Sequence, residues 1–76
     1  MRNRDQGSQV VAEMVAGVVE VGVAVGDAVD AGQQVVLLES MKMEIPVLAE
    51  VGGTVLEVKV GPGDVVQEGD VLVVLS

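Results

Sequence analysis

Apolar and polar residues after position 9 follow the pattern of short β-strands separated by glycine-containing turns. Two segments alternate with a period of two, which is typical of half-buried strands. One face of the first segment holds Val19, Val21, Val23 and Val25, and one face of the second holds Leu56, Val58 and Val60. Residues 35–38 and 71–75 are instead continuous apolar runs, which predict strands covered on both faces.

Residues 26–32 and 63–69 have the composition of paired turns around a very short strand. Each segment begins and ends with glycine, which supplies the positive φ that many tight turns need. Asp27 and Asp64 follow the first glycine, where a short carboxylate can accept a hydrogen bond from nearby backbone. The sequence therefore predicts a turn, a strand of a few residues and a second turn in each segment.

These elements occur twice. Residues 14–39 align without a gap with residues 51–76 when they are shifted by 37 positions. Ten aligned positions are identical: Val18/Val55, Glu20/Glu57, Val21/Val58, Val23/Val60, Gly26/Gly63, Asp27/Asp64, Val29/Val66, Gly32/Gly69, Val36/Val73 and Leu38/Leu75. Two copies of such a unit predict an all-β fold, either a flattened sandwich or a barrel, with pseudo-twofold symmetry.

The link between the copies, residues 40–48, is not repeated. A chain reversal between strands usually employs Asn-Gly, Asp-Gly or Gly-Gly, but residues 39–44 read Glu-Ser-Met-Lys-Met-Glu. A local rule broken at such a point indicates a functional site. The pattern leaves open a loose polar loop or a short helical turn, which Met, Lys and Glu favour.

The composition excludes several kinds of chemistry. The chain has 21 valines and no aromatic residue, which favours strands. It has no Cys and no His, so disulfides, thiol nucleophiles, imidazole bases and zinc sites of the usual kind are excluded. Residues 1–9 are polar and charged with no apolar period, and we expect a flexible tail or a remnant of an expression vector there.

Acidic residues outnumber basic ones by 12 to 4, which gives a net charge of −8 at pH 7. This charge argues against nucleic acid as a partner. No uncharged stretch approaches the roughly 20 residues of a membrane helix, and the start lacks the apolar segment of a secretory signal. We therefore expect no nucleic-acid partner, no membrane partner and a cytoplasmic location, which the lack of Cys also fits.

The two lysines are the remaining candidates for covalent chemistry. Lys59 lies on a strand face beside Glu57, where a solvated charge is expected. Lys42 lies in the unrepeated link between Met41 and Met43, whose flexible apolar side chains suit a partner surface. A lysine amine is a nucleophile only when deprotonated, and nothing in this chain would activate it at neutral pH. An outside enzyme would have to modify Lys42.

Catalytic and metal sites are not expected in this chain. Ser40 as a nucleophile would need Lys42 as its base, and nothing indicates that this amine is buried. Asp64 and Asp70 lack the alternating oxygen ligands of an EF-hand loop, and Asp beside Gly is common in turns.

Residues 39–47, Glu-Ser-Met-Lys-Met-Glu-Ile-Pro-Val, resemble the biotin-attachment motif of biotin carboxyl carrier domains. The resemblance covers about residues 13–76 and includes the Gly-Asp-x-Val-x-x-Gly turn of each half and the closing Val-Leu-Val-Val-Leu strand. Related lipoyl domains usually have Asp before the lysine and Ala after it. Ser40 stands where the family commonly has Ala. The gap-free repeat leaves no room for the thumb-like insertion of some bacterial carriers, so the chain resembles the minimal, thumbless form.

This resemblance implies a flattened eight-stranded barrel-sandwich in which residues 10–76 form a single biotinyl domain. Lys42 would lie at the tip of the hairpin that joins the halves, with both termini near the opposite end. Biotin would be its covalent cofactor. The residues implied around the attachment point are Met41 and Met43 as flanking recognition residues, and Glu39, Ser40 and Glu44 as hairpin context.

The implied function is that of a non-catalytic carrier. A biotin protein ligase would attach biotin to Lys42, and the arm would carry carboxylate, as carboxybiotin, from a biotin carboxylase to a carboxyltransferase. The acceptor would be a compound such as an acyl-CoA or a 2-oxo acid. Two alternatives stay open: a lipoyl-type swinging-arm carrier, and an unmodified structural or interaction module.

Overall fold

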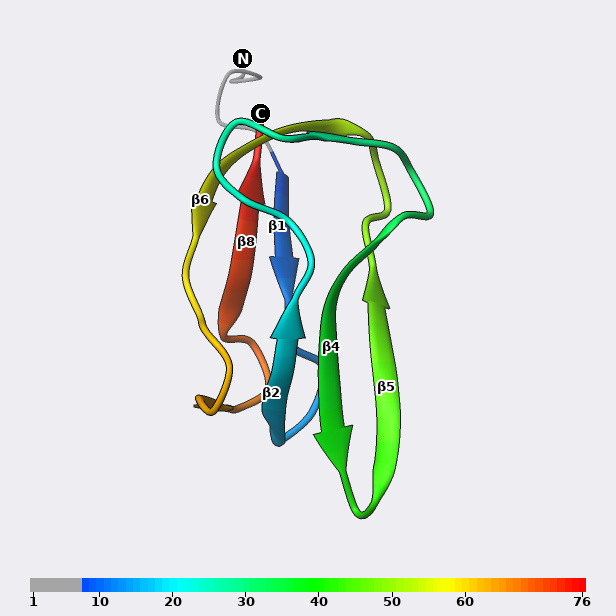
Figure 1. The fold of residues 1–76 in the computed structure, drawn as a ribbon, viewed down its shortest axis with the longest axis vertical. Coiled ribbons are helices and arrows are strands. Elements are labelled where there is room, and N and C mark those ends of the chain that lie inside the picture. Colours follow the sequence, from blue (N-terminus) through cyan, green and yellow to red (C-terminus); the bar gives the residue numbers. More distant parts are fainter. Residues whose placement is uncertain (1–7) are drawn as a thin grey trace.

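The valine-rich segments form eight strands in the computed structural model, which describes residues 8–76 (Figure 1). The strands are β1 (Ser8–Val11), β2 (Ala16–Val21), β3 (Ala28–Val29), β4 (Gln34–Ser40), β5 (Met43–Leu48), β6 (Gly53–Val58), β7 (Val65–Val66) and β8 (Val71–Leu75). No helix occurs in this described part of the chain, and hence none that could cross a membrane. The expected all-β class is confirmed.

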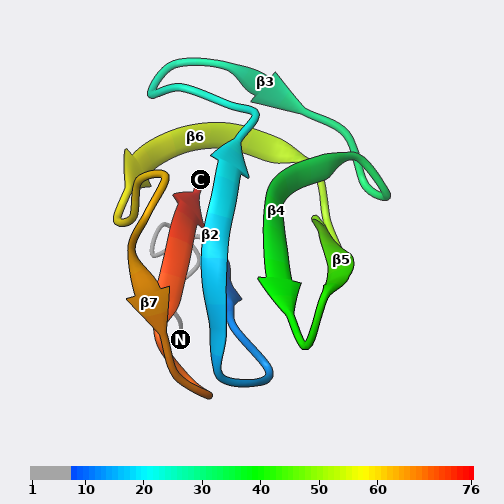
Figure 2. The ribbon, with the colours of Figure 1, turned by 60° about the horizontal axis from the view of Figure 1, so that its bottom comes forward.

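The strands form two four-stranded antiparallel sheets, in the orders β1-β8-β6-β3 and β5-β4-β2-β7. The shift of 37 positions converts β2 to β6, β3 to β7 and β4 to β8, and it exchanges the order of one sheet for that of the other. The two sheets curl around a common interior (Figure 2). The molecule is elongated, with extents of 40 × 22 × 18 Å, and its two related sheets form the pseudo-twofold sandwich that the repeat predicts.

The first strand begins earlier than the sequence pattern indicated. Ser8 and Gln9 were assigned to the tail, but they pair with Leu75 and Val74 of β8 and belong to β1. Their polar side chains carry no apolar signal, whereas the hydrogen bonds of strand pairing use only the backbone. Residues 1–7, the rest of the predicted tail, lie outside the described residues.

β1 also extends the repeat. Its equivalent in the second half is the part of β5 formed by residues 45–48, which the sequence pattern counted as unrepeated. The aligned identities Val10/Val47, Ala12/Ala49 and Glu13/Glu50 record this relation in the sequence. The unrepeated part of the described chain is therefore confined to the hairpin ahead of residue 45.

A β-bulge in each copy decides which valines face the core. The pairing of β2 with β4 shifts register at Val19, and that of β6 with β8 shifts at Leu56. An extra residue in a strand breaks the alternation of faces. Val19 and Leu56 are exposed, whereas Val18 and Val55 before them are buried. The faces expected from the alternation were therefore wrong at Val19 and Leu56, and also at Val25, which is exposed beyond the end of β2.

A second pair of irregularities explains the continuous apolar runs. The register shifts next to residue 35 in β4 and residue 72 in β8, so that two consecutive side chains of each strand are buried. The largest fully buried side chains are Val35, Val36, Leu38, Val55, Leu72, Val73 and Leu75. Burying a Val or Leu side chain stabilises a fold by about 1.5–3 kcal/mol. The core thus rests on aliphatic side chains of β4, β6 and β8.

The turns match the prediction in both copies. Gly26 and Gly63, the first glycines, have φ of 95° and 94°, and the second glycines also have positive φ. The Asp27 carboxylate accepts a hydrogen bond from the Ala24 N–H at 2.8 Å, and Asp64 accepts one from Gly61 at 2.8 Å. Asp70 accepts a bond from the Gln67 N–H in the same way. These aspartates therefore have structural roles in the turns.

Candidate functional site: the hairpin of Lys42

The hairpin of β4 and β5 extends beyond the body of the molecule, at the end opposite the termini (Figure 1). The pairs Glu39↔Glu44 and Ser40↔Met43 continue the ladder almost to the tip. Only Met41 and Lys42 remain in the connection. The link is therefore a two-residue hairpin loop, and the alternative of a loose loop or a short helical turn is wrong.

Both loop residues have backbone conformations that favour glycine. Met41 has φ of 53° and Lys42 has φ of 65°, and no other non-glycine residue in the described range 8–76 has positive φ. Two positive values are the signature of a type I′ turn, whose twist matches that of the flanking strands. Left-handed backbone costs a residue with a β-carbon roughly 1–2 kcal/mol. The pairing of β4 with β5 holds this strained turn in place, and strain of this kind concentrates at functional sites.

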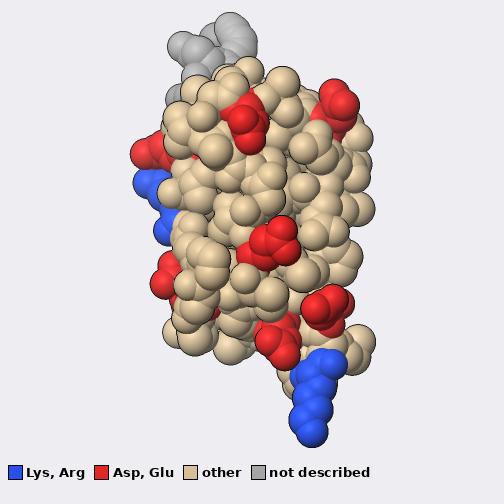
Figure 3. All heavy atoms as spheres, in the orientation of Figure 1, with Lys and Arg blue, Asp and Glu red and all other residues tan. Residues whose placement is uncertain are grey.

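The side chains at the tip are open to solvent. Met41 is 90% exposed, Met43 is 64% exposed and Lys42 is also exposed. A basic side chain projects beyond the body at the hairpin end, with acidic side chains near its base (Figure 3). The single ion pair among the described residues lies elsewhere, between Lys59 and Glu57 at 3.3 Å. The amine of Lys42 is thus presented freely to another molecule.

The hairpin has two chemically different faces. Leu38 is buried and faces the core, and the alternation along β4 places Ser40 on the same side but past the body. Its partner Met43 shares that side. Glu39 and Glu44 lie directly opposite each other on the other face, an arrangement that is unfavourable for like charges. The tip therefore combines an amine, apolar thioether side chains and a pair of carboxylates.

All six predicted site residues lie on this hairpin, whereas Lys59 does not. Lys59 follows β6 on the body of the molecule, and its backbone N–H donates to the carbonyl oxygen of Leu72 at 2.9 Å. The carboxylates of Glu39 and Glu44 are too weak as bases to deprotonate the ammonium group of Lys42 at neutral pH. The geometry suits an amine that receives an acyl group inside the active site of another enzyme.

Comparison with known protein families identifies a family whose matched region includes this hairpin. Residues 6–75 match the biotin/lipoyl attachment family, described as Biotin-requiring enzyme. The chain belongs to this family. Domains of the family are carriers of a covalently attached group and are not themselves catalysts. The predicted relation to biotinyl domains is confirmed.

Curated relatives are similar over part of the chain. Biotinylated protein TB7.3 of Mycobacterium tuberculosis is 70% identical over 37 residues, which are 49% of this chain and 52% of the relative. The match thus spans about half the length of each protein.

Solved structures match over nearly the whole chain. Kluyveromyces lactis urea carboxylase superposes with a TM-score of 0.88 at 32% identity, over 100% of this chain and 7% of that one. A single-chain, multi-domain long-chain acyl-CoA carboxylase superposes with a TM-score of 0.84 at 34% identity, over 96% of this chain and 7% of that one. The lipoyl domain of the Azotobacter vinelandii 2-oxoglutarate dehydrogenase complex superposes with a TM-score of 0.70 at 31% identity, over 82% of this chain and 78% of that one. The fold is therefore shared by parts of two carboxylases and by a lipoyl domain, and the fold alone does not separate a biotinyl role from a lipoyl role.

Proposed function

We propose that this domain is a biotin carboxyl carrier, biotinylated on Lys42 by a biotin protein ligase. The observation that carries the proposal is the exposed Met-Lys-Met apex of a two-residue hairpin in a chain of the biotin/lipoyl attachment family. An amine at such an apex can enter a narrow active site while the body stays outside. The name of the mycobacterial relative, a biotinylated protein, favours biotin as the attached group.

The residues of the hairpin have distinct parts in this proposal. The amine of Lys42 displaces AMP from biotinyl-adenylate and forms an amide, and the ligase supplies the base that accepts its proton. Met41 and Met43 provide adaptable apolar contacts to the ligase. The Glu39–Glu44 and Ser40–Met43 pairs fix the direction in which the apex points. Biotin, once attached, supplies the group that holds the transferred carboxylate.

The catalytic partners in this proposal are a biotin carboxylase and a carboxyltransferase. The domain corresponds to 7% of the urea carboxylase chain and of the acyl-CoA carboxylase chain that share its fold. A biotinyl domain of this kind is thus compatible with catalytic units elsewhere in an assembly, acting on an acceptor such as an acyl-CoA.

A lipoyl-type carrier is the second candidate, because a lipoyl domain has the same fold. The methionines on both sides of Lys42 favour biotin, since lipoyl domains usually have Asp and Ala there. An unmodified interaction module is the third candidate, and the strained, exposed apex of the hairpin argues against it.

The intact mass of the protein separates these candidates. The chain is expressed in a host that contains biotin, lipoate and both attachment enzymes, and the purified protein is weighed by mass spectrometry. We expect the increment of one biotinyl amide. A lipoyl increment would replace the proposal with the second candidate, and an unmodified mass despite active ligase would support the third.

A further inference from the structure

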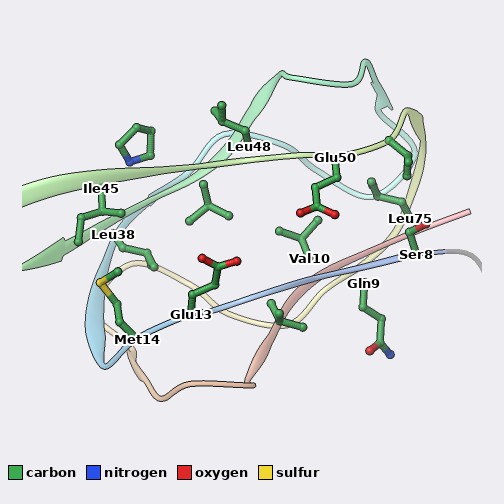
Figure 4. A pocket seen from close by; sticks show the side chains of 14 residues that line it. Ser8, Gln9, Val10, Glu13, Met14, Leu38, Ile45, Leu48, Glu50 and Leu75 are labelled. Carbon is green, nitrogen blue, oxygen red and sulfur yellow. The ribbon is translucent and has the colours of Figure 1, made fainter.

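A cavity of about 290 Å³ opens between β1 and β5, away from the hairpin tip (Figure 4). Each is one of the two outer strands of its sheet: within the described residues, β1 pairs with β8 alone, and β5 pairs with β4 alone. The fourteen residues that line the cavity form seven pairs related by the shift of 37 positions, among them Glu13 with Glu50. The cavity therefore lies on the pseudo-twofold axis, and its two walls have identical residues in three of the pairs and apolar residues on both sides in two more.

Much of the wall is apolar and open to solvent. Val11, Met14, Leu48 and Val51 line the cavity and are 37%, 40%, 51% and 47% exposed, respectively. Exposed apolar residues gathered in one hollow indicate an interaction site. Small-molecule pockets typically measure about 300–1,000 Å³. A cavity at the lower limit suits a few side chains of a partner better than a whole cofactor.

Two carboxylates give the cavity its charge. The side chains of Glu13 and Glu50 point into it from opposite walls (Figure 4). Within residues 8–76, neither carboxylate takes part in an ion pair or in a side-chain hydrogen bond. A guanidinium or ammonium group placed between them would complement both charges at once.

A partner segment is not expected to add a strand to β5. Proline has no N–H to donate, and Pro46 lies within β5, the outer strand on one side of the cavity. Prolines in outer strands discourage the pairing of a further strand.

We propose that this cavity, called the β1–β5 groove below, binds an extended partner segment in which an arginine or lysine lies between apolar side chains. The cation occupies the space between Glu13 and Glu50, and the apolar side chains contact Val11 and Leu48. Because the groove lies on the side of the body, a docked segment leaves Lys42 free. Because the walls are related by twofold symmetry, the segment can run in either direction.

The test uses the ¹⁵N-labelled chain and the peptide acetyl-Val-Leu-Arg-Leu-Val-amide, followed by NMR. A control peptide carries citrulline, which is neutral, in place of arginine. We expect saturable shifts of the backbone amides of Val11, Glu13, Leu48 and Glu50, with little change at Lys42. The citrulline peptide should bind at least about fivefold more weakly, because charge-assisted hydrogen bonds are roughly twice as strong as neutral ones.

Matched variants connect binding to the two carboxylates. The Glu13→Gln, Glu50→Gln protein should bind the arginine peptide about tenfold more weakly. A Glu20→Gln, Asp30→Asn protein loses the same charge at exposed positions that do not line the cavity, and should lose less than twofold. If both variants lost the same affinity for the arginine peptide, the effect would come from net charge alone, and the proposal would be overturned. So would the absence of saturable shifts in the groove at millimolar peptide.

NMR spectra recorded without peptide test two other possible occupants of the groove: the N-terminal segment of this chain and a second copy of the chain. If Arg2→Gln, Arg4→Gln shifts the groove amides of the free protein, the N-terminal segment of this chain occupies the groove. If those amides shift with protein concentration, a second copy occupies it. Either result would overturn the proposal of a separate partner segment. The intact mass of each variant reports biotinylation independently, so that a failure here is distinct from a failure of the carrier function.

Discussion

Lys42 and Lys59 are chemically the same side chain in different backbone settings. Lys42 lies at the apex of a turn whose two residues have no ladder partner. Lys59 has its backbone N–H bonded to the carbonyl oxygen of Leu72, and its amine is paired with Glu57. An enzyme that surrounds its lysine with binding residues can reach the first without disturbing the fold. We therefore expect such an enzyme to select Lys42 over Lys59 by the position of the residue and not by its type.

The first prediction is that modification is confined to Lys42. Lys42→Arg keeps the charge but removes the acylated amine, and should abolish both streptavidin binding and the biotinyl mass increment. The matched variant Lys59→Arg should be modified to the same extent as the unaltered chain. Biotin retained in the Lys42→Arg protein would contradict the assignment.

The second prediction concerns the strained residue Met41. Asn tolerates left-handed backbone much better than Met does. Met41→Asn should therefore raise the free energy of unfolding by about 1 kcal/mol. Met43→Asn, in a strand position without positive φ, should give no such gain. Denaturant midpoints of the two variants make the comparison, and a midpoint for Met41→Asn at or below that of Met43→Asn would contradict it.

The Met41→Asn variant also tests whether the ligase recognises the thioether of Met41. If Met41 contacts the ligase, Met41→Asn should be biotinylated more slowly although it is more stable, because the substitution removes that contact. The rate of biotin incorporation at limiting ligase is the measurement. An unchanged rate would show that the turn geometry suffices for recognition without the thioether.

At the scale of elements, turns were easier to predict than strand faces. Glycine and aspartate specify a turn through their own backbone and side-chain preferences, so residues 26–32 and 63–69 could be assigned from local sequence. A bulge depends on the partner strand, and the alternating valines contain no sign of the extra residue at Val19. The hairpin was located by what the repeat left out, but its turn type was not predicted, because strand pairing imposes positive φ on Met41 and Lys42.

The third prediction compares glycines of the same loop. Gly63→Ala should destabilise the fold by roughly 1–2 kcal/mol, because a β-carbon at φ of 94° is strained although nothing lies within 4 Å of it. Gly26→Ala should behave alike in the other copy. Gly61→Ala is the control, since its added β-carbon also meets nothing within 4 Å and its φ is not positive. Equal denaturant midpoints for all three would contradict the role assigned to the turns.

The fourth prediction separates buried from partly buried valines. Val21 and Val58 lie on the alternating faces of the two half-buried segments, and Val36 and Val73 lie in the continuous apolar runs. Only Val36 and Val73 are fully buried, whereas Val21 and Val58 pack at the margin of the core. Val36→Ala and Val73→Ala should each cost about 1–3 kcal/mol. Val21→Ala and Val58→Ala should cost less than half as much in the same chemical denaturation assay. Similar costs at all four positions would mean that the margin is packed as tightly as the centre.

At the scale of the whole molecule, the pseudo-twofold symmetry separates the site from the chain ends. Ser8 pairs with Leu75, so both ends of the described chain lie together, opposite the hairpin (Figure 1). A domain with this arrangement can be joined to other domains without covering Lys42. In the two carboxylases that share the fold, the matched region is 7% of the chain, and one of them is a single-chain, multi-domain enzyme.

The net charge also acts at this scale. Residues 10–76 contain 11 acidic and two basic residues, a net charge of −9, and an amide at Lys42 would make it −10. Glu39 and Glu44 bring part of that charge to the hairpin. A carrier that visits two active sites benefits from fast and weak encounters, which long-range attraction to basic surfaces provides. We expect the ligase and the carboxylase to surround their active sites with positive charge. The alternative is that the acids only keep a valine-rich surface in solution.

The fifth prediction distinguishes these roles through salt. Raising ionic strength from about 0.01 to 1 M shortens the Debye length from about 30 to 3 Å. With the carrier below saturation, the apparent second-order rate constant of biotin transfer should fall across this range. The fall should be smaller for Glu39→Gln, Glu44→Gln than for Glu20→Gln, Asp30→Asn, which removes two exposed acids away from the tip. If the rate constant does not change with salt in the unaltered chain or in either variant, solubility remains as the role of the charge. A salt dependence equal in the two variants would assign steering to the net charge of the body and not to the carboxylates beside Lys42.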